Sequence, residues 1–320
     1  MQTVNNNNTK LSVMMFVEWF IWGAWFVPLW QYLNKLGFSP SEIAWSYSST
    51  AIAAILSPVL VGVIADRYFA AQKVLGWLHI VGGGLMLLLA WQIQFSTFFP
   101  LLVVYALTYM PTVALTNSIA FANIRDTEKD FPRIRVLGTL GWIASGLVVG
   151  FVLPPLLGME NVSDTNLPLI VTAIASVLLG LYSFMLPNTP PKVGQRTDIK
   201  DLLGLNALGL LRDRTFAIFA LCSFLFCMPL AFYYQFANGY LTQVGLQNAT
   251  GWMTLGQVSE IFAMLALPFL LKRYGIKKVL LLGFVTAGIR YVLFIYGGTA
   301  DMLMYSMLFI GILLHGVSYD

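Results

Sequence analysis

The sequence predicts an all-α protein that crosses a membrane many times, and two features of the 320-residue chain support this prediction. Hydrophobic residues make up 58% of the chain and charged residues only 10%, whereas about a quarter of the residues of a typical soluble domain are charged. The apolar residues also form continuous runs, not the alternating segments of about 10 residues that build a membrane β-barrel. A polytopic helical membrane protein is the class that fits both features.

Ten apolar runs are each close to the roughly 20 residues that a helix needs to cross a bilayer. The first run follows a polar, Asn-rich start and is too long and too aromatic for a cleaved signal peptide, so we expect a retained first helix. The runs fall at residues 11–33, 42–65, 74–95, 98–123, 136–157, 167–187, 215–241, 250–271, 277–296 and 302–320.

The basic residues predict how these helices are oriented. When alternate loops are assigned to opposite sides of the membrane, 16 of the 18 Lys and Arg residues fall on the side of the N-terminus. Lys35 lies alone on the other side, and Arg290 lies inside a helix. Because positively charged loops stay in the cytoplasm, we expect a cytoplasmic N-terminus. The net charge of +4 is explained by these loops and does not indicate binding to nucleic acid.

A long polar segment divides the chain into two parts. It spans residues 188–214, follows Pro187, and separates a six-helix bundle at 1–187 from a C-terminal bundle at 215–320. A short repeat supports the division, because Asp66-Arg67-Tyr68 follows the second run and Lys272-Arg273-Tyr274 follows the eighth. We therefore expect 188–214 to be a cytoplasmic linker between two related halves.

The segment from Gly62 to Arg67 resembles the G-x-x-x-D-R signature that lies between helices 2 and 3 of major facilitator transporters, with Asp66 at its acidic position. Its later basic part is degenerate here. The resemblance implies two six-helix halves with the substrate held between them. Ten runs are two fewer than this fold requires, so we expect a truncated sequence whose C-terminal bundle is incomplete at Asp320. A natural stop there would demand another account of the fold.

Glu260 is the side chain that most strongly indicates a function. It lies deep inside the run at 250–271, where an ionised side chain costs about 2.5–3.5 kcal/mol. Gln257 lies one turn earlier on the same helical face. Because protonation removes both the charge and its cost, we predict that Glu260 is a protonation switch facing a polar cavity.

Glu18 is a second acid within an apolar run, and it shares a helical face with Trp22 and Trp25. Two interpretations are equally weighted: a structural carboxylate that accepts from a tryptophan N–H, or a second proton site. His79, in the third run, is expected to be a packing residue in preference to a proton relay.

Arg135, Thr139 and Trp142 also share one helical face. A guanidinium, a hydroxyl and an indole on one stripe suit a polar ligand that carries a ring. The alternative places Arg135 at the membrane interface and Trp142 against lipid. Gly138 and Gly141 favour a cavity, because small residues allow helices to approach closely around it.

Other polar residues give weaker signals. The polar and aromatic residues near the outer end of the seventh helix are expected to form an interface belt; they are Tyr233, Tyr234, Gln235 and Asn238. Arg290 either neutralises a carboxylate or extends to the interface, and the pattern does not decide. Cys222 and Cys227, in the same run, are interpreted as packing residues, with no disulfide and no metal site. With no nucleophile–base pair and no phosphate loop, we expect neither an enzyme nor a bound cofactor.

Four segments together resemble the bacterial nucleoside:proton symporters of the major facilitator superfamily, in order and spacing over essentially the whole chain. They are Trp22-Gly23-Ala24-Trp25, Asp130 to Trp142, Gln257-Val258-Ser259-Glu260 and His315-Gly316-Val317-Ser318-Tyr319-Asp320. The resemblance implies import of nucleosides with protons, in the lipid bilayer of the bacterial cytoplasmic (inner) membrane. The rival functions are transport of another polar substrate, such as a sugar or nucleobase, and a non-transporting membrane sensor.

The same resemblance implies roles for individual residues. Arg135 and Thr139 would hydrogen bond to the nucleoside, and Trp142 would pack on it. Gln257 would contact the ligand and Glu260 would couple to the proton, while His315 and Tyr319 stand at positions where the family commonly has aromatic contacts. Two departures from the family's residue pattern bear on the identity of the substrate more than on the mode of transport. Ala231 and Tyr234 replace a binding Gln and Asn, and Glu18 stands where an uncharged amide is expected.

Overall fold

A computed structural model describes residues 2–64, 69–191 and 205–319 of the chain. Asp66 and Arg67 of the expected loop signature lie outside the described residues, whereas the backbone of Gly62 lies near the end of a helix. Every regular element in the described part is helical. Seven of these helical stretches are long and apolar enough to cross a membrane, and two shorter apolar helices accompany them.

The N-terminal part of the chain forms one group of helices. These are α1 (Gln2–Phe26), α2 (Leu29–Lys35), α3 (Pro40–Ile64), α4 (Ala71–Leu89), α5 (Phe95–Asn123), α6 (Thr127–Leu147), the π-helical turn η1 (Val148–Val152), α7 (Leu153–Leu157) and α8 (Leu167–Ser183). Their core joins aliphatic side chains to aromatic ones such as Trp25, Phe98 and Tyr105, all fully buried. We call this group the N-terminal half.

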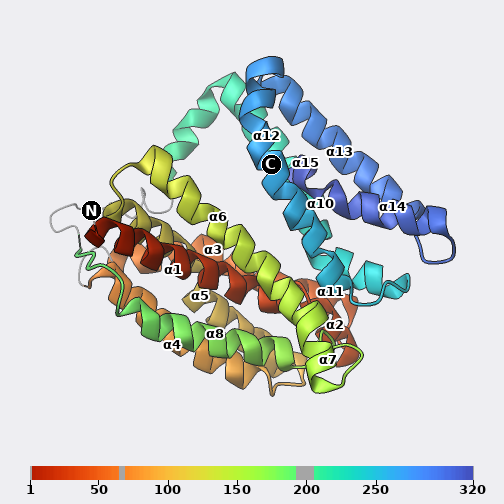
Figure 1. Cartoon of the computed structure of the whole chain (residues 1–320), viewed down its shortest axis with the longest axis horizontal. Coiled ribbons are helices and arrows are strands. Elements are labelled where there is room, and N and C mark those ends of the chain that lie inside the picture. Colours follow the sequence, from red (N-terminus) through yellow and green to blue (C-terminus); the bar gives the residue numbers. More distant parts are fainter. Residues whose placement is uncertain (1, 65–68, 192–204, 320) are drawn as a thin grey trace.

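The C-terminal part forms a second group, which Figure 1 shows in cyan to blue. Its elements are the 3₁₀ segment η2 (Leu205–Arg212), α10 (Arg214–Gln243), α11 (Ala249–Trp252), α12 (Thr254–Tyr274), α13 (Ile276–Tyr296), α14 (Met302–Leu313) and α15 (His315–Tyr319). Large apolar side chains such as Phe224 and Leu265 are exposed on it, at 62% and 73%. A bilayer is the solvent that such a surface requires. We call this group the C-terminal half.

The helices occupy all ten predicted apolar runs, but four of the runs are interrupted. The first breaks at Pro28, between α1 and α2, and the fifth contains the π-helical turn. The eighth breaks at Met253 and the tenth at Leu314. Proline accounts for the first break because it cannot donate a backbone hydrogen bond inside a helix.

Within the N-terminal half, α1 and α6 approach each other closely because of two glycines. A Cβ atom at Gly141 would overlap the carbonyl of Phe16, and one at Gly138 would lie 2.6 Å from Cδ1 of Trp19. Small residues at a helix contact allow the backbones to approach, as the sequence predicted for these positions. The close approach brings the aromatic face of α1 next to the stripe of α6 that carries Arg135.

The two halves meet at one end of the molecule, where α2, α7 and α11 lie (Figure 1). Direct contacts between halves join α2 to α10, η1 to α11, and the last turns of α6 to the first turns of α12. Trp30 fills the space beside Gly239, and Gly150 lies against Gly251. We call this the closed end. The start of α10 and the end of α12, with their basic residues, lie at the opposite end, which we call the basic end.

A chain of hydrogen bonds between uncharged side chains crosses the closed end. The amide nitrogen of Gln31 donates to Oδ1 of Asn238 at 2.6 Å, and its oxygen accepts from Asn161 at 2.8 Å. Asn238 in turn donates to Thr250 at 3.0 Å, and the Thr250 hydroxyl lies 2.9 Å from that of Ser163. We call these five residues the clasp. Gln31, Asn238, Thr250 and Ser163 are buried, and their bonds link the halves without any charge.

We expect the substitution Gln31→Ala to open the closed end more often. It removes the partner of the Asn238 side-chain oxygen and that of the Asn161 side-chain nitrogen, which costs about 1–3 kcal/mol for each buried polar group left unpaired. Double electron–electron resonance between spin labels at Met159 and Gln247, in a chain with both native cysteines replaced, measures the separation of the halves there. The population at long distance should grow.

Asn34→Ala is the matched control, because Asn34 is exposed on the same short helix. It should leave the distance distribution unchanged. Identical distributions for Gln31→Ala and the unmodified chain would contradict a holding role for the clasp.

Candidate functional site

A cavity of about 410 Å³ lies between the two halves. Its volume is in the range of about 300–1,000 Å³ typical of small-molecule sites. Both halves contribute to its wall, which is made of Trp19, Trp22, Phe26, Tyr47, Ser48, Thr50, Ala51, Arg135, Thr139 and Trp142 on one side and Ala231, Tyr234, Gln235, Gln257, Glu260 and His315 on the other. A ligand here would therefore touch both halves at once.

The wall from the N-terminal half combines one cation with stacked indoles. The guanidinium carbon of Arg135 lies 4.2 Å from the centre of the Trp19 ring. Trp22 stacks on Trp19 at 5.4 Å and meets Trp142 edge-on at 5.9 Å. Thr139 is buried beside them. A guanidinium held over an indole keeps its planar set of donors in place at a small entropic cost.

Asp126 caps the start of α6, the helix that carries Arg135, Thr139 and Trp142. Its carboxylate accepts from the backbone nitrogens of Glu128 and Lys129, both at 3.1 Å. This cap satisfies two of the amides that a helix start leaves unpaired. It fixes the start of α6, and with it the register of Arg135, two turns further on.

The wall from the C-terminal half is built where α12 and α15 touch. Gly316 has no room for a side chain against the backbone of Glu260. The backbone nitrogen of Gly316 donates to Oγ of Ser259 at 3.0 Å, and that hydroxyl donates to the Gly256 carbonyl at 2.6 Å. These contacts hold His315, the first residue of α15, beside Glu260.

Glu260 faces this cavity and not the outer surface of the helix bundle. Its side chain is 13% exposed, and its Oε2 lies 3.8 Å from Nε2 of His315. Gln257, one turn earlier, is buried and lines the same cavity. The arrangement offers a carboxylate that can exchange a proton with water in the cavity while an imidazole and an amide lie close to it.

Six of the residues singled out in the sequence thus line one cavity: Arg135, Thr139, Trp142, Gln257, Glu260 and His315. The lipid-facing alternative for Trp142 does not hold, because its ring packs on Trp22 inside the cavity wall. The side chain of Tyr319 lies outside the part of the chain whose side chains are described.

Glu18 lies elsewhere. It is completely buried inside the N-terminal half and does not line the cavity. Its carboxylate contacts His79 and Thr112, so the expected contact with a tryptophan N–H is not the one that forms. His79 is correspondingly not an isolated packing residue, since its ring contacts this carboxylate at 2.8 Å.

Several cavity residues were not anticipated from the sequence. Gln235 lines the cavity, whereas an interface belt was expected for it; Tyr234 also lines the cavity, as the family resemblance implied and the expected belt did not. Trp19, on the helical face next to Trp22, was not considered, and neither was the polar stretch around Ser48 and Thr50 in the second run. The polarity of that stretch inside an apolar run is a signal that could have identified it.

Arg290 points into the C-terminal half and not toward the membrane–water interface. Its guanidinium carbon lies 3.6 Å from the centre of the Tyr233 ring, and its Nε donates to the carbonyl of Gly311 at 2.8 Å. Tyr233 also packs on His315, with ring centres 5.2 Å apart. Arg290 therefore supports the wall that carries His315 from behind. Within the described residues, no group of three or more His, Cys, Asp or Glu side chains could hold a metal ion.

Comparison with known proteins gives consistent matches. Residues 5–320 match the family described as nucleoside H⁺ symporter. The putative nucleoside transporter YegT of Escherichia coli K12 is 68% identical over 311 residues, which cover 97% of this chain and 73% of that protein. The xanthosine permease of the same organism is 32% identical, over 97% of this chain and 76% of that protein.

The fold matches a solved structure as well. The crystal structure of the nucleoside transporter NupG superposes with a TM-score of 0.86 at 30% identity, over 98% of this chain and 80% of that one. A bacterial homologue of the lysosomal transporter Spinster superposes with a TM-score of 0.71 at 14% identity, which supports the fold alone.

We expect Gly141→Ala to destabilise the N-terminal half, because the added methyl group would force α6 away from the backbone of Phe16. Overpacking of this kind costs typically about 1–3 kcal/mol. Thermal unfolding in detergent micelles should show a lower midpoint. Gly84→Ala is the control, because a Cβ atom there meets nothing within 4 Å. Equal midpoints for the two variants would show that the α1–α6 approach is not a tight contact.

Proposed function

Because the chain belongs to the nucleoside H⁺ symporter family, we propose that it is a secondary transporter that imports nucleosides together with protons, by alternating access of the cavity between its halves. The observation that carries this proposal is that one cavity brings Arg135 and Trp142 from the N-terminal half together with Glu260 from the C-terminal half. A substrate and a proton bound there both act on the contact between halves. The chain is a transporter and not an enzyme.

The chemistry of the wall suits a nucleoside. A planar base can pack against the indole of Trp142 or the ring of Tyr234, and ring stacking of this kind favours aromatic ligands. Arg135, Thr139 and Gln257 offer donors and acceptors for ribose hydroxyls and base edges. We assign these residues, with Glu260 and His315, to substrate binding, and Tyr319 by its place in the family motif.

The wall contributed by α10 bears on which nucleosides fit. It presents the methyl group of Ala231 and the phenol of Tyr234, with the amide of Gln235 as its polar group. A phenol offers one hydroxyl for donation or acceptance and a large apolar face. We therefore expect this wall to select by ring shape more than by multiple hydrogen bonds.

Glu260 is the group to which we assign proton coupling. A carboxylate at membrane depth is costly when ionised, and protonation removes that cost. In the proposed cycle, Glu260 takes up a proton from the outside while a nucleoside binds beside it. The neutral, loaded cavity then permits the halves to rock, and loss of the proton to the cytoplasm accompanies release. The membrane potential supplies about 2.3 kcal/mol per charge per 100 mV for this accumulation.

We place the basic end in the cytoplasm of a bacterium and the closed end outside its cytoplasmic membrane. The supporting observation is the excess of Lys and Arg on the side of the N-terminus, since such loops stay in the cytoplasm. With this orientation the clasp seals the outer side. The structure then represents the inward-facing state of the cycle.

We expect Glu260→Gln to abolish accumulation of labelled uridine against its gradient and to retain exchange of uridine across the membrane. The amide mimics the protonated carboxyl, so the cavity can still rock when loaded but carries no proton. Uptake into proteoliposomes with an imposed pH gradient measures accumulation, and counterflow measures exchange. Glu160→Gln, at an exposed loop position, is the control and should accumulate uridine normally. Normal accumulation by Glu260→Gln would overturn the assignment.

A further inference from the structure

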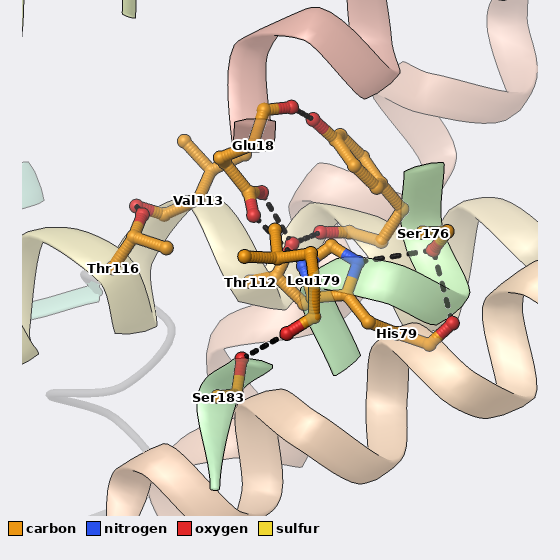
Figure 2. A network of polar contacts seen from close by, with 9 residues as sticks. Glu18, His79, Thr112, Val113, Thr116, Ser176, Leu179 and Ser183 are labelled. Carbon is orange, nitrogen blue, oxygen red and sulfur yellow. Dashed lines mark hydrogen bonds and ion pairs between the residues drawn. The ribbon is translucent and has the colours of Figure 1, made fainter. Parts of the chain in front are cut away.

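A second acid–base pair lies inside the N-terminal half, away from the cavity. Oε2 of Glu18 on α1 lies 2.8 Å from Nε2 of His79 on α4. Both side chains are buried, at 0% and 1% exposure. The hydroxyl of Thr112 on α5 lies 2.6 Å from Oε1 of Glu18 and 2.5 Å from the Tyr109 carbonyl oxygen, and Ser176 on α8 lies 3.1 Å from Nδ1 of His79 (Figure 2). One network thus ties four helices together.

The hydroxyl of Ser176 fixes the protonation of the histidine ring. It donates to the backbone carbonyl of His79 at 2.9 Å. A serine hydroxyl has a single proton, so the same oxygen can only accept in its contact with Nδ1. Nδ1 of His79 therefore carries a proton and donates it to Ser176.

The contact between Nε2 and the carboxylate then requires a further proton. With Nδ1 protonated, a neutral imidazole has only a lone pair at Nε2. Two lone pairs facing each other at 2.8 Å would repel in a fully buried site. One proton must lie between Oε2 of Glu18 and Nε2 of His79. When the Thr112 hydroxyl donates to Oε1, the pair has no net charge, whether the shared proton is on the acid or on the ring.

We propose that Glu18 and His79 are a fixed proton-binding site, which holds one shared proton throughout transport and is separate from the proton that Glu260 exchanges. Every partner of the pair, on α1, α4, α5 and α8, belongs to the N-terminal half. Rocking of one half against the other moves these four helices together. The contacts that hold the proton consequently stay the same in both orientations of the cavity.

Within the described part of the chain, no fixed positive charge lies against the pair that could take the place of the shared proton. Among the described side chains on the packed helices, the titratable groups that face the pair are Tyr109, whose hydroxyl donates to the backbone carbonyl of Glu18 at 2.6 Å, and Tyr105, stacked on it. On α8, the hydroxyl of Tyr182 is occupied by the carbonyl of Lys10. On α6, Arg135 is directed to Trp19 and the cavity. Loss of the proton would leave a buried anion, which costs several kcal/mol.

The inference rests on the proposed function only in assigning the transported proton to Glu260, and one experiment examines the pair directly. The chain has two histidines, so ¹⁵N-histidine labelling of the full chain in lipid bilayers gives two ring systems, which His315→Gln assigns. We expect a strongly deshielded proton signal that correlates with Nε2 of His79, exchanges slowly in D₂O and stays unchanged on addition of uridine. The absence of a proton between Nε2 and Glu18, or its loss during turnover, would overturn the proposal.

Transport by Glu18→Gln provides the second test. A glutamine amide donates to Nε2 of His79 and keeps the site neutral without the shared proton. We expect this variant to accumulate uridine to the same ratio as the unmodified chain, with the same number of protons per uridine. Loss of accumulation with retained exchange would show that the shared proton is transported. Normal accumulation by Glu260→Gln would instead refute the proposed coupling site. The NMR measurement would then still decide whether Glu18 and His79 share a proton.

Discussion

The carboxylate of Glu260 imposes the constraint on which the rest of the structure depends. A charge at membrane depth must face a polar cavity, pair with another group or take up a proton. In this protein it faces a cavity whose opposite wall comes from the other half of the molecule. In the proposed cycle, this place links the protonation of the acid to the contact between halves. A bilayer-facing carboxylate on the same helix would have no such connection.

Three polar clusters of this protein differ in where their partners lie. In the cavity, the proposed partners of Glu260 are the substrate and the proton, which bind and leave in every cycle. The clasp around Gln31 closes one end with uncharged hydrogen bonds, each worth little enough to break in every cycle. The pair of Glu18 and His79 lies inside one half, where its contacts do not depend on the position of the other. The role of each polar cluster thus depends on where its partners lie. Partners in the opposite half make a contact that can change, as in the cavity and the clasp, whereas partners in the same half make a fixed one, as in the pair of Glu18 and His79.

Much of this arrangement could be predicted from local sequence patterns. The helices follow from apolar runs, and the stripe of Arg135, Thr139 and Trp142 follows from helical periodicity. Contacts between distant segments could not be predicted in this way. Glu18 and His79 are separated by 61 residues, and Gln31 meets Asn238 across 207. Helix breaks without proline, such as the one at Leu314, are also set by tertiary packing and leave no local signature.

The most direct test of the account is whether a uridine gradient alone moves protons. Proteoliposomes containing the full chain and an internal pH indicator would receive external uridine, with no imposed pH gradient and with the membrane potential clamped. The account predicts acidification of the interior that follows uridine entry and is absent from liposomes without protein. Uridine entry with no change of internal pH would contradict the claim that a cavity carboxylate couples the two fluxes.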